Sequence, residues 1–509
     1  MAIFDCIFPI LGYVALPCYL LLFCYRISLH PLSKYPGPFL AKLSDCYGGF
    51  YASLGCLPRV TWRDHLKYGP VIRHGPDRLV FNSVAALKDI YQNDRLTKSR
   101  VYLFTQRAPN VYSLFNATDR QMHRAKRKLI GSAVNEHSMR GFEPIMQGQI
   151  DIFLKQILLA SMTSEVVNMS ELSKRLGMDI AGLLAFGYNL NLLTDPANRK
   201  LISTIGNGNW RFNTCMQFPL LNKLRIHTIM AILNYLFGGG KDFFLLLKKM
   251  IQSRLAESRD AKHDLYSFVA HAMTPSAEEK LSLSDIWSEA FFFFPAAGDT
   301  TATTISALFF YLSRYPEHHD KLAKEIRDTF QSGDDIRGGP QLSSCKYLRA
   351  CIDEALRMAP PVSGTLWREK ASDDDSSQGP LIIDSHIIPQ GIKVGVNIFA
   401  LHHNEDYFAD PFTFNPTRWL SSEIPEENRK LMRDAFIPFS TGARSCAGKA
   451  MAYLQASLVV AKTLWSYDFK ADPEDLDETG SHAKEYQLYD VFSSTHNGPN
   501  LIFSPRIID

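Results

Sequence analysis

The segment "PFSTGARSCAGKA", residues 438–450, places a single cysteine in a glycine-containing loop. Cys446 lies between Gly442 and Gly448, and Arg444 precedes it by two residues. The apolar run "AMAYLQASLVVAKTLW", residues 450–465, follows at once and is long enough to form a buried helix. We therefore predict a loop that presents Cys446 at the amino-terminal end of a core helix.

Three features of this segment favour the thiolate form of Cys446, which is the form that binds metals. Arg444 supplies positive charge, and a helix beginning at about Ala447 directs the positive end of its dipole at the sulfur. Gly442 and Gly448 leave room for backbone amides and a flat ligand. Because no Cys or His partner is near, the thiolate does not suit zinc, but it suits haem, whose porphyrin supplies four nitrogens. The alternative is an ordinary buried cysteine.

The composition is that of a large globular chain with no obvious linker or repeat. The chain has 509 residues and a net charge of +3, so nothing in it favours nucleic acid as a partner. Its nine cysteines are scattered and include no C-x-x-C pair. This pattern is typical of reduced thiols, not of a disulfide framework.

The amino-terminal segment is different, because residues 7–25, "IFPILGYVALPCYLLLFCY", carry no charge. As a helix they would extend about 28 Å, close to the thickness of the hydrocarbon core of a bilayer. Basic residues follow this stretch, whereas only Asp5 precedes it, and this bias favours a cytosolic location for the rest of the chain. We expect residues 1–30 to be a single-pass membrane anchor and residues 31–509 to be one catalytic domain. The alternative is a cleaved signal peptide.

Residues 282–314 form a long, almost wholly apolar stretch, which predicts a helix buried on all sides. Glu289 and Asp299 interrupt it and disfavour a second membrane span. Pro295, Gly298 and several threonines fall within about three turns, so we predict a local opening or kink that makes a polar notch beside Asp299. The alternative is a bend whose threonines bond to their own helix.

A second helix, residues 347–361, carries Glu354 and Arg357 three residues apart, so both lie on one face. The neighbouring residues are apolar, which indicates partial burial and the need for a further donor. Arg418, in the loop "FNPTRW", is available for that role. Residues 379–403 alternate between apolar and polar side chains, so the fold class is mainly α with small β-sheets.

The fixed positions of "FSTGARSCAG", residues 439–448, match the haem-binding signature Phe-x-x-Gly-x-Arg-x-Cys-x-Gly, and the chain thereby resembles the cytochrome P450 family. Glu354-x-x-Arg357 resembles the paired helix motif of that family, and Arg418 resembles its third member. The "AAGDTT" segment, residues 296–301, is similar to the oxygen-activation motif. The motifs come in family order and extend over essentially the whole chain, with the character of fungal, membrane-bound members.

The resemblance implies the cytochrome P450 fold and a haem b whose iron is bound by Cys446. It further implies that Phe439, Arg444, His123 and Arg127 contact the cofactor. His123 and Arg127 lie in the segment "DRQMHRAKRK", residues 119–128, which resembles the family segment that reaches the haem propionates.

Two positions depart from the family pattern in the oxygen-activation segment. Ala297 stands where the family usually has glycine, and Pro295 just before it is uncommon. Both bear on proton delivery, and neither bears on the assignment of haem.

By resemblance, the function is that of a monooxygenase that transfers one oxygen atom from O2 to a lipophilic substrate. Asp299 and Thr300 would then be the catalytic residues that relay protons. Electrons would come from NADPH through a membrane-bound reductase, because the sequence has no flavin or dinucleotide fingerprint. Lys449, Lys126 and Lys128 are the basic residues expected to receive that reductase.

The resemblance also implies an endoplasmic reticulum location and a role in fungal secondary metabolism. Two other functions stay open, namely a reductase-independent haem isomerase or dehydratase, and a non-catalytic membrane haem protein. We expect the substrate pocket to be completed by the loop at residues 100–117 and the tip at residues 494–500. Its main lining is expected to be Phe291, Phe294, Ala297, Val362 and Leu366.

Overall fold

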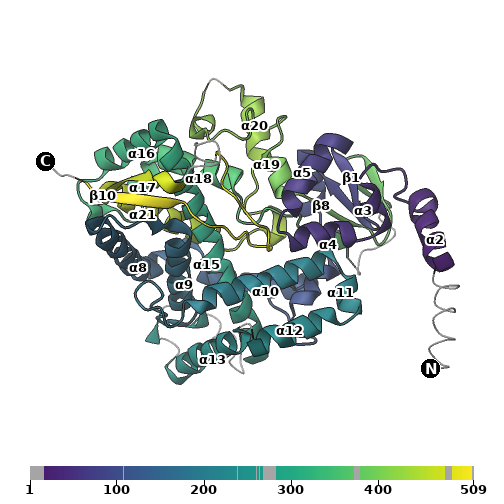
Figure 1. Ribbon diagram of the computed structural model, residues 1–509, viewed down its shortest axis with the longest axis horizontal. Helices are drawn as coiled ribbons and strands as arrows, with labels where there is room; N and C mark the ends of the chain where they lie inside the picture. The colour runs from purple at the N-terminus through teal and green to yellow at the C-terminus, as the bar shows by residue number, and fades with distance from the viewer. Residues whose placement is uncertain are drawn as a thin grey trace.

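The computed structural model describes residues 16–506, apart from residues 107, 238, 259–260, 263, 268–282, 372–378, 423 and 476–483. A large helical body carries a small sheet at the end nearest the amino-terminal helix (Figure 1). The helices are α2 (Leu16–Cys24), α3 (Phe39–Leu43), α4 (Cys46–Ser53), α5 (Leu57–Tyr68), α6 (Val84–Tyr91), α7 (Arg120–Ala133), α8 (Glu136–Met162), α9 (Met169–Phe186), α10 (Lys200–Gln217), α11 (Leu220–Lys223), α12 (Ile226–Phe237), α13 (Gly240–Ala256), α15 (Leu283–Arg314), α16 (Pro316–Thr329), α17 (Pro340–Ser344), α18 (Lys346–Met358), α19 (Ile398–His402), α20 (Glu426–Ala435) and α21 (Lys449–Ser466).

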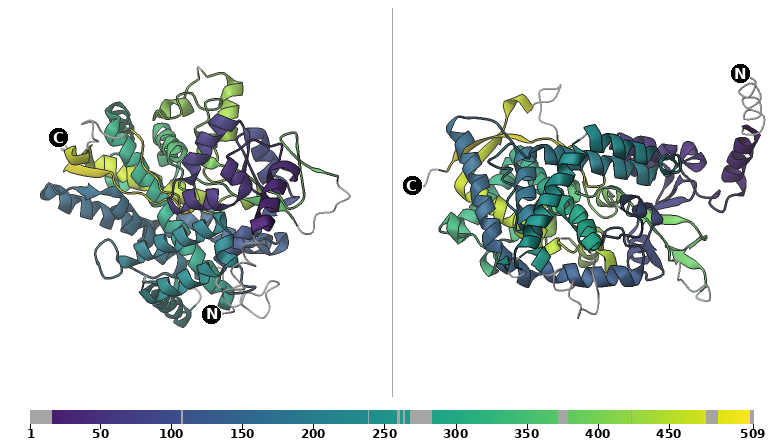
Figure 2. Two further views of the ribbon diagram at one scale, coloured as in Figure 1. Left: turned by 45° about the vertical axis from the view of Figure 1, so that its right-hand side comes forward. Right: turned by 90° about the horizontal axis from the view of Figure 1, so that it is seen from below.

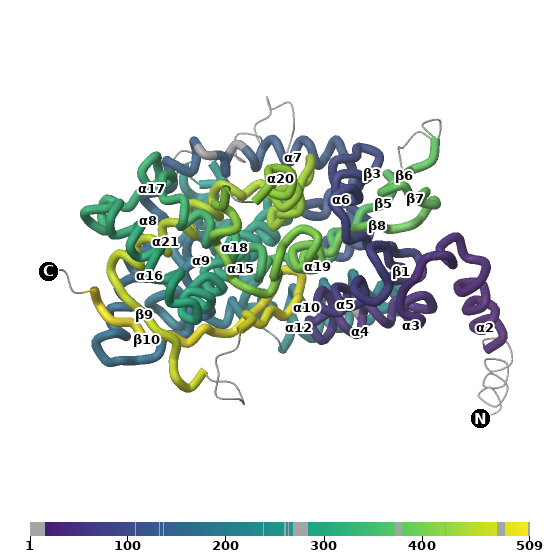
Figure 3. Tube along the Cα trace, turned by 90° about the horizontal axis from the view of Figure 1, so that it is seen from above, coloured from purple at the N-terminus to yellow at the C-terminus, as the bar shows by residue number. Residues whose placement is uncertain are grey.

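The sheets are small, as the sequence predicts. The largest has five strands in the order β1-β2-β8-β5-β3, and Figure 3 shows it beside α6. A three-stranded sheet has the order β4-β10-β9, and β6 pairs with β7 alone. The strands are β1 (Val71–Gly75), β2 (Arg78–Phe81), β3 (Leu96–Lys98), β4 (Val167–Asn168), β5 (Arg368–Lys370), β6 (Leu381–Ile383), β7 (His386–Ile388), β8 (Lys393–Val396), β9 (Tyr467–Ala471) and β10 (Asn500–Pro505).

The long helix α15 crosses the middle of the body and packs against α9, α18 and α21 (Figure 1). Its carboxy-terminal half is buried all round, which explains why its apolar residues follow no single stripe. The closest crossing is with α9, where a Cβ on Gly177 would lie 2.4 Å from the carbonyl oxygen of Gly298. The absence of a side chain at Gly177 therefore allows the two helix backbones to touch.

The opening predicted within α15 is absent, because every residue from Leu283 to Arg314 is helical, Pro295 included. Instead, the hydroxyls of three threonines donate to carbonyl oxygens four residues earlier in the same helix. The bond from Thr300 Oγ1 to the oxygen of Ala296 measures 2.8 Å. The threonines thus bond internally, as the alternative interpretation has it.

The predicted ion network is buried behind the loop that holds η7 (Pro416–Trp419). Arg357 Nη2 and Arg418 Nε both donate to Glu354 Oε1, at 2.8 and 3.0 Å. Burial alone would raise the pKa of Glu354, but the two guanidinium groups hold it below its usual value. The indole of Trp419 and the amide of Asn415 donate to the same carboxylate, so its lone pairs are satisfied.

At the amino-terminal end, α2 continues into the π-helical turn η2 (Tyr25–Leu29), and neither buries a residue. Both stand at one end of the molecule, outside the body (Figures 1 and 3). Residues 1–15, which include the first part of the apolar segment expected to be an anchor, lie outside the described residues.

Within the part of the chain that the structure describes, no single helix has both the length and the hydropathy of a membrane span. The helices 228–237 and 240–256 meet that criterion only jointly, and the chain bends by 77° between them. Leu16–Leu29 is apolar but shorter than a span.

Candidate active site

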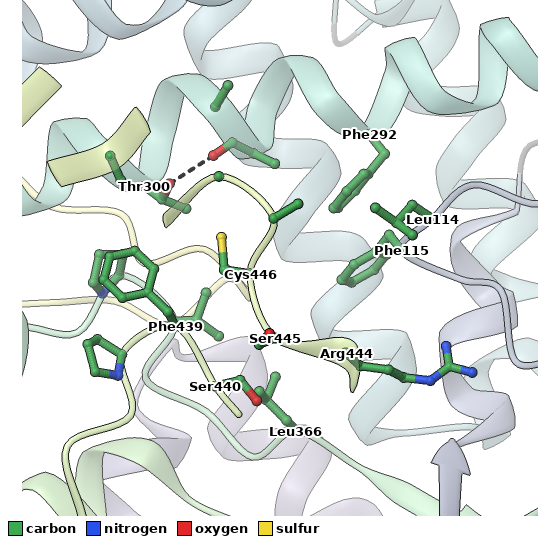
Figure 4. Close-up of a pocket in the computed structure, with 18 of the residues that line it drawn as sticks. Leu114, Phe115, Phe292, Thr300, Leu366, Phe439, Ser440, Arg444, Ser445 and Cys446 are labelled. Atoms are coloured by element: carbon green, nitrogen blue, oxygen red, sulfur yellow. Dashed lines mark hydrogen bonds between the residues drawn. The ribbon is translucent and has the colours of Figure 1, made fainter. Parts of the chain in front are cut away.

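A cavity of about 1470 Å³, its open mouth included, lies between α15 and the loop before α21. We call it the central cavity. Figure 4 shows the sulfur of Cys446 pointing into it from below, while Thr300 and Phe292 project from α15 above. Residues from the sequence motifs meet here although they are far apart in the chain. The expected site residues that line it are His123, Arg127, Ala297, Thr300, Val362, Leu366, Phe439, Arg444 and Cys446.

The loop before α21 holds Cys446 in a fixed position. Its backbone N–H donates to the carbonyl oxygen of Phe439 at 2.8 Å, which closes the loop before the helix begins at Lys449. Burial raises the pKa of the thiol, while the backbone amide of Gly448 and the charges of Arg127 and Lys449 act in the opposite direction. The environment alone therefore favours the thiol, and a metal cation is what would hold the thiolate.

Arg444 does not supply the positive charge near the sulfur, so that part of the prediction is wrong. Its guanidinium points away from Cys446 (Figure 4) and donates to the carbonyl oxygens of Ala117 and Thr118. The cations that act on the thiol are Arg127 and Lys449, and Arg127, on α7, donates to the carbonyl oxygen of Ser445. The long side chain of Arg444 reaches this neighbouring loop, a contact that sequence spacing does not reveal.

Of the two glycines, Gly448 agrees with the predicted role and Gly442 does not. Gly442 has a φ of +75°, and a Cβ there would lie 1.9 Å from the carbonyl oxygen of Tyr91. It therefore lets the loop pack against the end of α6 and makes no room for a ligand. At Gly448, a Cβ would meet only the sulfur of Cys446, at 4.0 Å, so this glycine keeps the space beside the thiol open.

Several cationic side chains that are far apart in the sequence lie together at one edge of the central cavity. Lys98 on β3 and Arg368 on β5 face each other directly in the antiparallel register. Like charges in such a pair destabilise a sheet. Burial and the charges of Arg368, Arg444 and Arg127 lower the pKa of Lys98 well below its usual value. For His123, burial and the same group of cations, Arg444 first, lower the pKa to about 3.

This cluster of unbalanced positive charge fits an anionic ligand with more than one acid group. Haem has that chemistry, because its two propionates match the cations at the edge and its iron matches the thiol of Cys446 in the floor. The open space next to Gly448 leaves the thiol accessible to a flat ring. The residues present therefore fit haem, which Cys446 would bind through iron and Arg127, Lys98 and Arg368 would hold at its acid edge.

The face of α15 opposite Cys446 is lined with small and hydroxylated residues, including Ala296, Ala297, Thr300, Thr301 and Thr304. The hydrogen of the Thr300 hydroxyl is used by the carbonyl of Ala296, so the lone pairs of its oxygen face the cavity. They can accept a hydrogen bond from a bound group.

Asp299 lies next to this face but does not line the cavity. Lys174, on α9, is the charge acting on its side chain, and the residue is 9% exposed. Burial raises the pKa of Asp299 to about 6, and Lys174 opposes the rise. A carboxyl group with this pKa exchanges protons near neutral pH.

The pocket prediction is wrong for Phe291 and Phe294. Phe294 is 1% exposed and packs in the core, and Phe291 lines a different cavity. The phenylalanines of this run that line the central cavity are Phe292 and Phe293, which precede Ala296 and Ala297 by one helical turn. A run of four identical residues has no periodicity, so the sequence could not show which of them face the cavity.

The surrounding loops agree in part with expectation. Tyr102, Leu114 and Phe115 complete the cavity from the predicted loop at residues 100–117. Phe115 stacks on Phe292, with ring centroids 4.6 Å apart. From the carboxy-terminal loop the lining residue is Phe492, just before the predicted tip at residues 494–500.

Comparison with known proteins agrees with this geometry. The chain belongs to the cytochrome P450 family, since the family model described as Cytochrome P450 matches residues 59–488. It is 34% identical to the cytochrome P450 monooxygenase AKT7 of Alternaria alternata, over 97% of this chain and 96% of that protein.

Two further relatives have similar coverage. The cytochrome P450 monooxygenase poxM of Penicillium oxalicum is 33% identical, over 95% of this chain and 92% of its own length. The cytochrome P450 monooxygenase apf7 of Gibberella fujikuroi is 32% identical, over 95% of each chain.

Proposed function

We propose that this protein is a haem-thiolate monooxygenase that inserts one oxygen atom from O2 into a lipophilic substrate. The observation that carries the proposal is that the Cys446 thiol and the Thr300 hydroxyl enter one cavity from opposite walls (Figure 4). Haem bound to Cys446 supplies the redox chemistry that activates dioxygen. The monooxygenases to which this chain is similar over nearly its full length support the same reaction class.

The protein's own residues would hold the substrate and deliver protons. Phe115, Phe292 and Phe492 form an apolar wall that excludes water and receives an apolar substrate. Asp299 is the proton donor, since its pKa of about 6 lets it exchange protons with solvent at neutral pH. Thr300 Oγ1 orients the proton acceptor within the cavity, one residue along the same helix.

The proton relay is consistent with Ala297 in place of the usual glycine. Ala297 lines the cavity beside Thr300, and its methyl group narrows the space there without blocking the hydroxyl. Pro295 is accommodated within the continuous helix α15, so the relay does not need a break in that helix.

We further propose that electrons come from NADPH through a reductase in the endoplasmic reticulum membrane, with residues 1–30 as the anchor and the catalytic domain in the cytosol. Lys449 and Lys128 are exposed and remain available to a partner. Lys126 is not available to a partner, because it is buried and donates to Glu289 Oε1 at 3.0 Å. A role in fungal secondary metabolism is part of this proposal and is supported by the fungal relatives.

The deciding experiment reconstitutes the full chain with haem and a fungal NADPH reductase and supplies an extract of fungal metabolites. A monooxygenase consumes NADPH and O2 and forms products heavier by one oxygen atom, which carry label from 18O2. Products formed without NADPH would favour an isomerase or dehydratase, and absence of any turnover would favour a non-catalytic haem protein.

A further inference from the structure

A second cavity lies beside the central one, under the layer of helices formed by α10, α12 and α13. In Figures 1 and 2 this layer covers the side of the body next to α15. The cavity encloses about 1290 Å³, its open mouth included, and we call it the lateral cavity. Its aromatic walls are Phe212, Tyr235, Phe243, Phe244 and Phe291. No residue of the oxygen-activation relay lines it.

Two residues that line this cavity carry buried hydrogen-bond donors that have no acceptor among the described residues. Arg211, on α10, lines the lateral cavity, and its Nε is buried with no hydrogen-bond partner in the part of the chain that the structure describes. Gln106, which caps η3 (Arg100–Thr105), lines the same cavity, and its Nε2 is likewise buried and unpaired within the described ranges. Asn209 differs, because its amide already donates to Ser493 Oγ at 3.0 Å.

The charge of Arg211 is also unbalanced. Among the described residues no carboxylate forms an ion pair with it, and its recorded contact is with the ring of its neighbour Phe212, 4.9 Å from the guanidinium carbon. Burial lowers the pKa of Arg211, and the Cys215 thiol is the one group that opposes this. A guanidinium at an aromatic cavity with a free donor is best satisfied by a planar anion, which it can bind through two parallel hydrogen bonds.

The lateral and central cavities share their walls. On α15, Phe291 and Pro295 line the lateral cavity, whereas Phe292 and Ala296, one residue later in each case, line the central cavity. The segment around η3 also lies between the two cavities, because Tyr102 lines the central cavity and Gln106 lines the lateral cavity. A molecule held in the lateral cavity is therefore adjacent to the site of oxidation.

We propose that the lateral cavity is a recognition site for a carboxylate group of the substrate, with Arg211 as the anion-binding residue and Gln106 as a second donor. The proposal rests on the proposed monooxygenase function and narrows its substrate class to an acid with a bulky apolar or aromatic body. The aromatic walls bind that body, and the acid group is held away from the carbon that is oxidised.

The test measures the binding of a matched pair of probes to the haem-loaded full chain. The probes are 1-pyrenebutanoic acid and its methyl ester, which differ in charge and share one aromatic body. Fluorescence anisotropy gives both dissociation constants without any turnover. We expect the wild type to bind the acid at least about tenfold more tightly than the ester, the effect of one charge-assisted contact.

Substitutions of residues that line the lateral cavity test whether the preference for the acid over the ester arises there. Arg211→Gln should weaken binding of the acid about tenfold and leave binding of the ester unchanged, while Arg211→Lys should keep part of the preference. Gln106→Leu should cause a smaller loss for the acid. Lys223→Gln removes an exposed cation of α11 that does not line the cavity, and it should behave as the wild type.

The proposal is overturned if the acid and the ester bind equally, if the acid does not bind, or if Arg211→Gln keeps the acid preference. The spectrum of the reduced carbon monoxide complex, recorded on each preparation, reports folding and haem binding. NADPH oxidation is measured separately, so a failed monooxygenase assay with an intact acid preference refutes the function and not the binding site.

Discussion

Gly177 of α9 and Gly298 of α15 meet backbone to backbone, since a Cβ on the first would lie 2.4 Å from the carbonyl oxygen of the second. Lys174 lies about one turn before Gly177, and Asp299 directly follows Gly298. The close crossing therefore brings Lys174 of α9 near enough to Asp299 of α15 for its charge to lower the pKa of that carboxyl group.

Replacing Gly177 with alanine should destabilise the protein by about 1–3 kcal/mol, because the added methyl group overpacks a helix crossing that cannot separate freely. Urea unfolding followed by circular dichroism measures the change. The matched control is Gly148→Ala in α8, where a Cβ would meet nothing within 4 Å. That variant should gain up to about 1 kcal/mol from helix propensity. Equal stabilities for the two variants would contradict the close crossing.

The Cys446→Ser variant should lose the red-shifted Soret band of the reduced carbon monoxide complex, because a serine oxygen cannot replace the thiolate as iron ligand. The absorption spectrum of purified protein checks this. Cys46→Ser, at a cysteine that does not line the central cavity, should keep the band. A wild-type spectrum for the Cys446 variant would rule out ligation by this residue.

The Thr300→Ala variant should separate NADPH consumption from product formation, since it removes the hydroxyl that faces the central cavity. We expect product per NADPH to fall about a hundredfold, the lower end of the range for the loss of a positioned proton-transfer group, with hydrogen peroxide released instead. Thr301→Ala alters a neighbouring hydroxyl of the same cavity wall and should stay coupled. Full coupling in the Thr300 variant would remove it from the relay.

Asp299 should make stability depend on pH between about 4 and 6. Burial raises its pKa to about 6, so in this range the folded protein binds more protons than the unfolded chain. The free energy of unfolding therefore decreases as pH rises from about 4 to about 6, by up to about 3 kcal/mol. The Asp299→Asn variant should flatten this slope when urea unfolding is compared across that range. An unchanged slope would show that the carboxylate is not buried in the folded state.

Lys98 should oppose the stability of the haem-free protein while supporting haem binding. The Lys98→Gln variant removes a like-charge pair with Arg368, so the haem-free form should gain up to about 1 kcal/mol. The same variant should lose haem faster to an acceptor protein, because one of the cations that would bind the acid groups of haem is removed. Lys128→Gln, at an exposed lysine of α7, is the control. A variant with weaker haem-free stability would contradict the role of Lys98.

The sequence predicted the parts of the site that depend on short spacings. The Cys446 loop and its helix are contiguous, and the i, i+3 spacing of Glu354 and Arg357 placed both on one helical face. The burial of that pair followed from its apolar neighbours. Such features need little knowledge of which distant segments pack together.

The rest of the site depends on long-range packing. Lys98 and Arg368 meet only because two short strands pair across some 270 residues of chain. The direction of Arg444 depends on a loop more than 300 residues earlier. In the phenylalanine run of α15, identical side chains hide the helical phase, and the face that reaches the central cavity is fixed by the packing of α9 against the other side.

The uninterrupted course of α15 has a consequence for regiochemistry. Phe291, at the lateral cavity, and Thr300, at the central cavity, lie nine residues apart on one continuous helix, a separation of about 13.5 Å along the axis at the rise of an α-helix. The helix therefore fixes the distance between the acid-binding residue's cavity and the site of oxidation. For a substrate gripped at its acid end, the oxidised position is then counted from that end, and homologues of different chain length should be oxidised at the same distance from the carboxyl carbon.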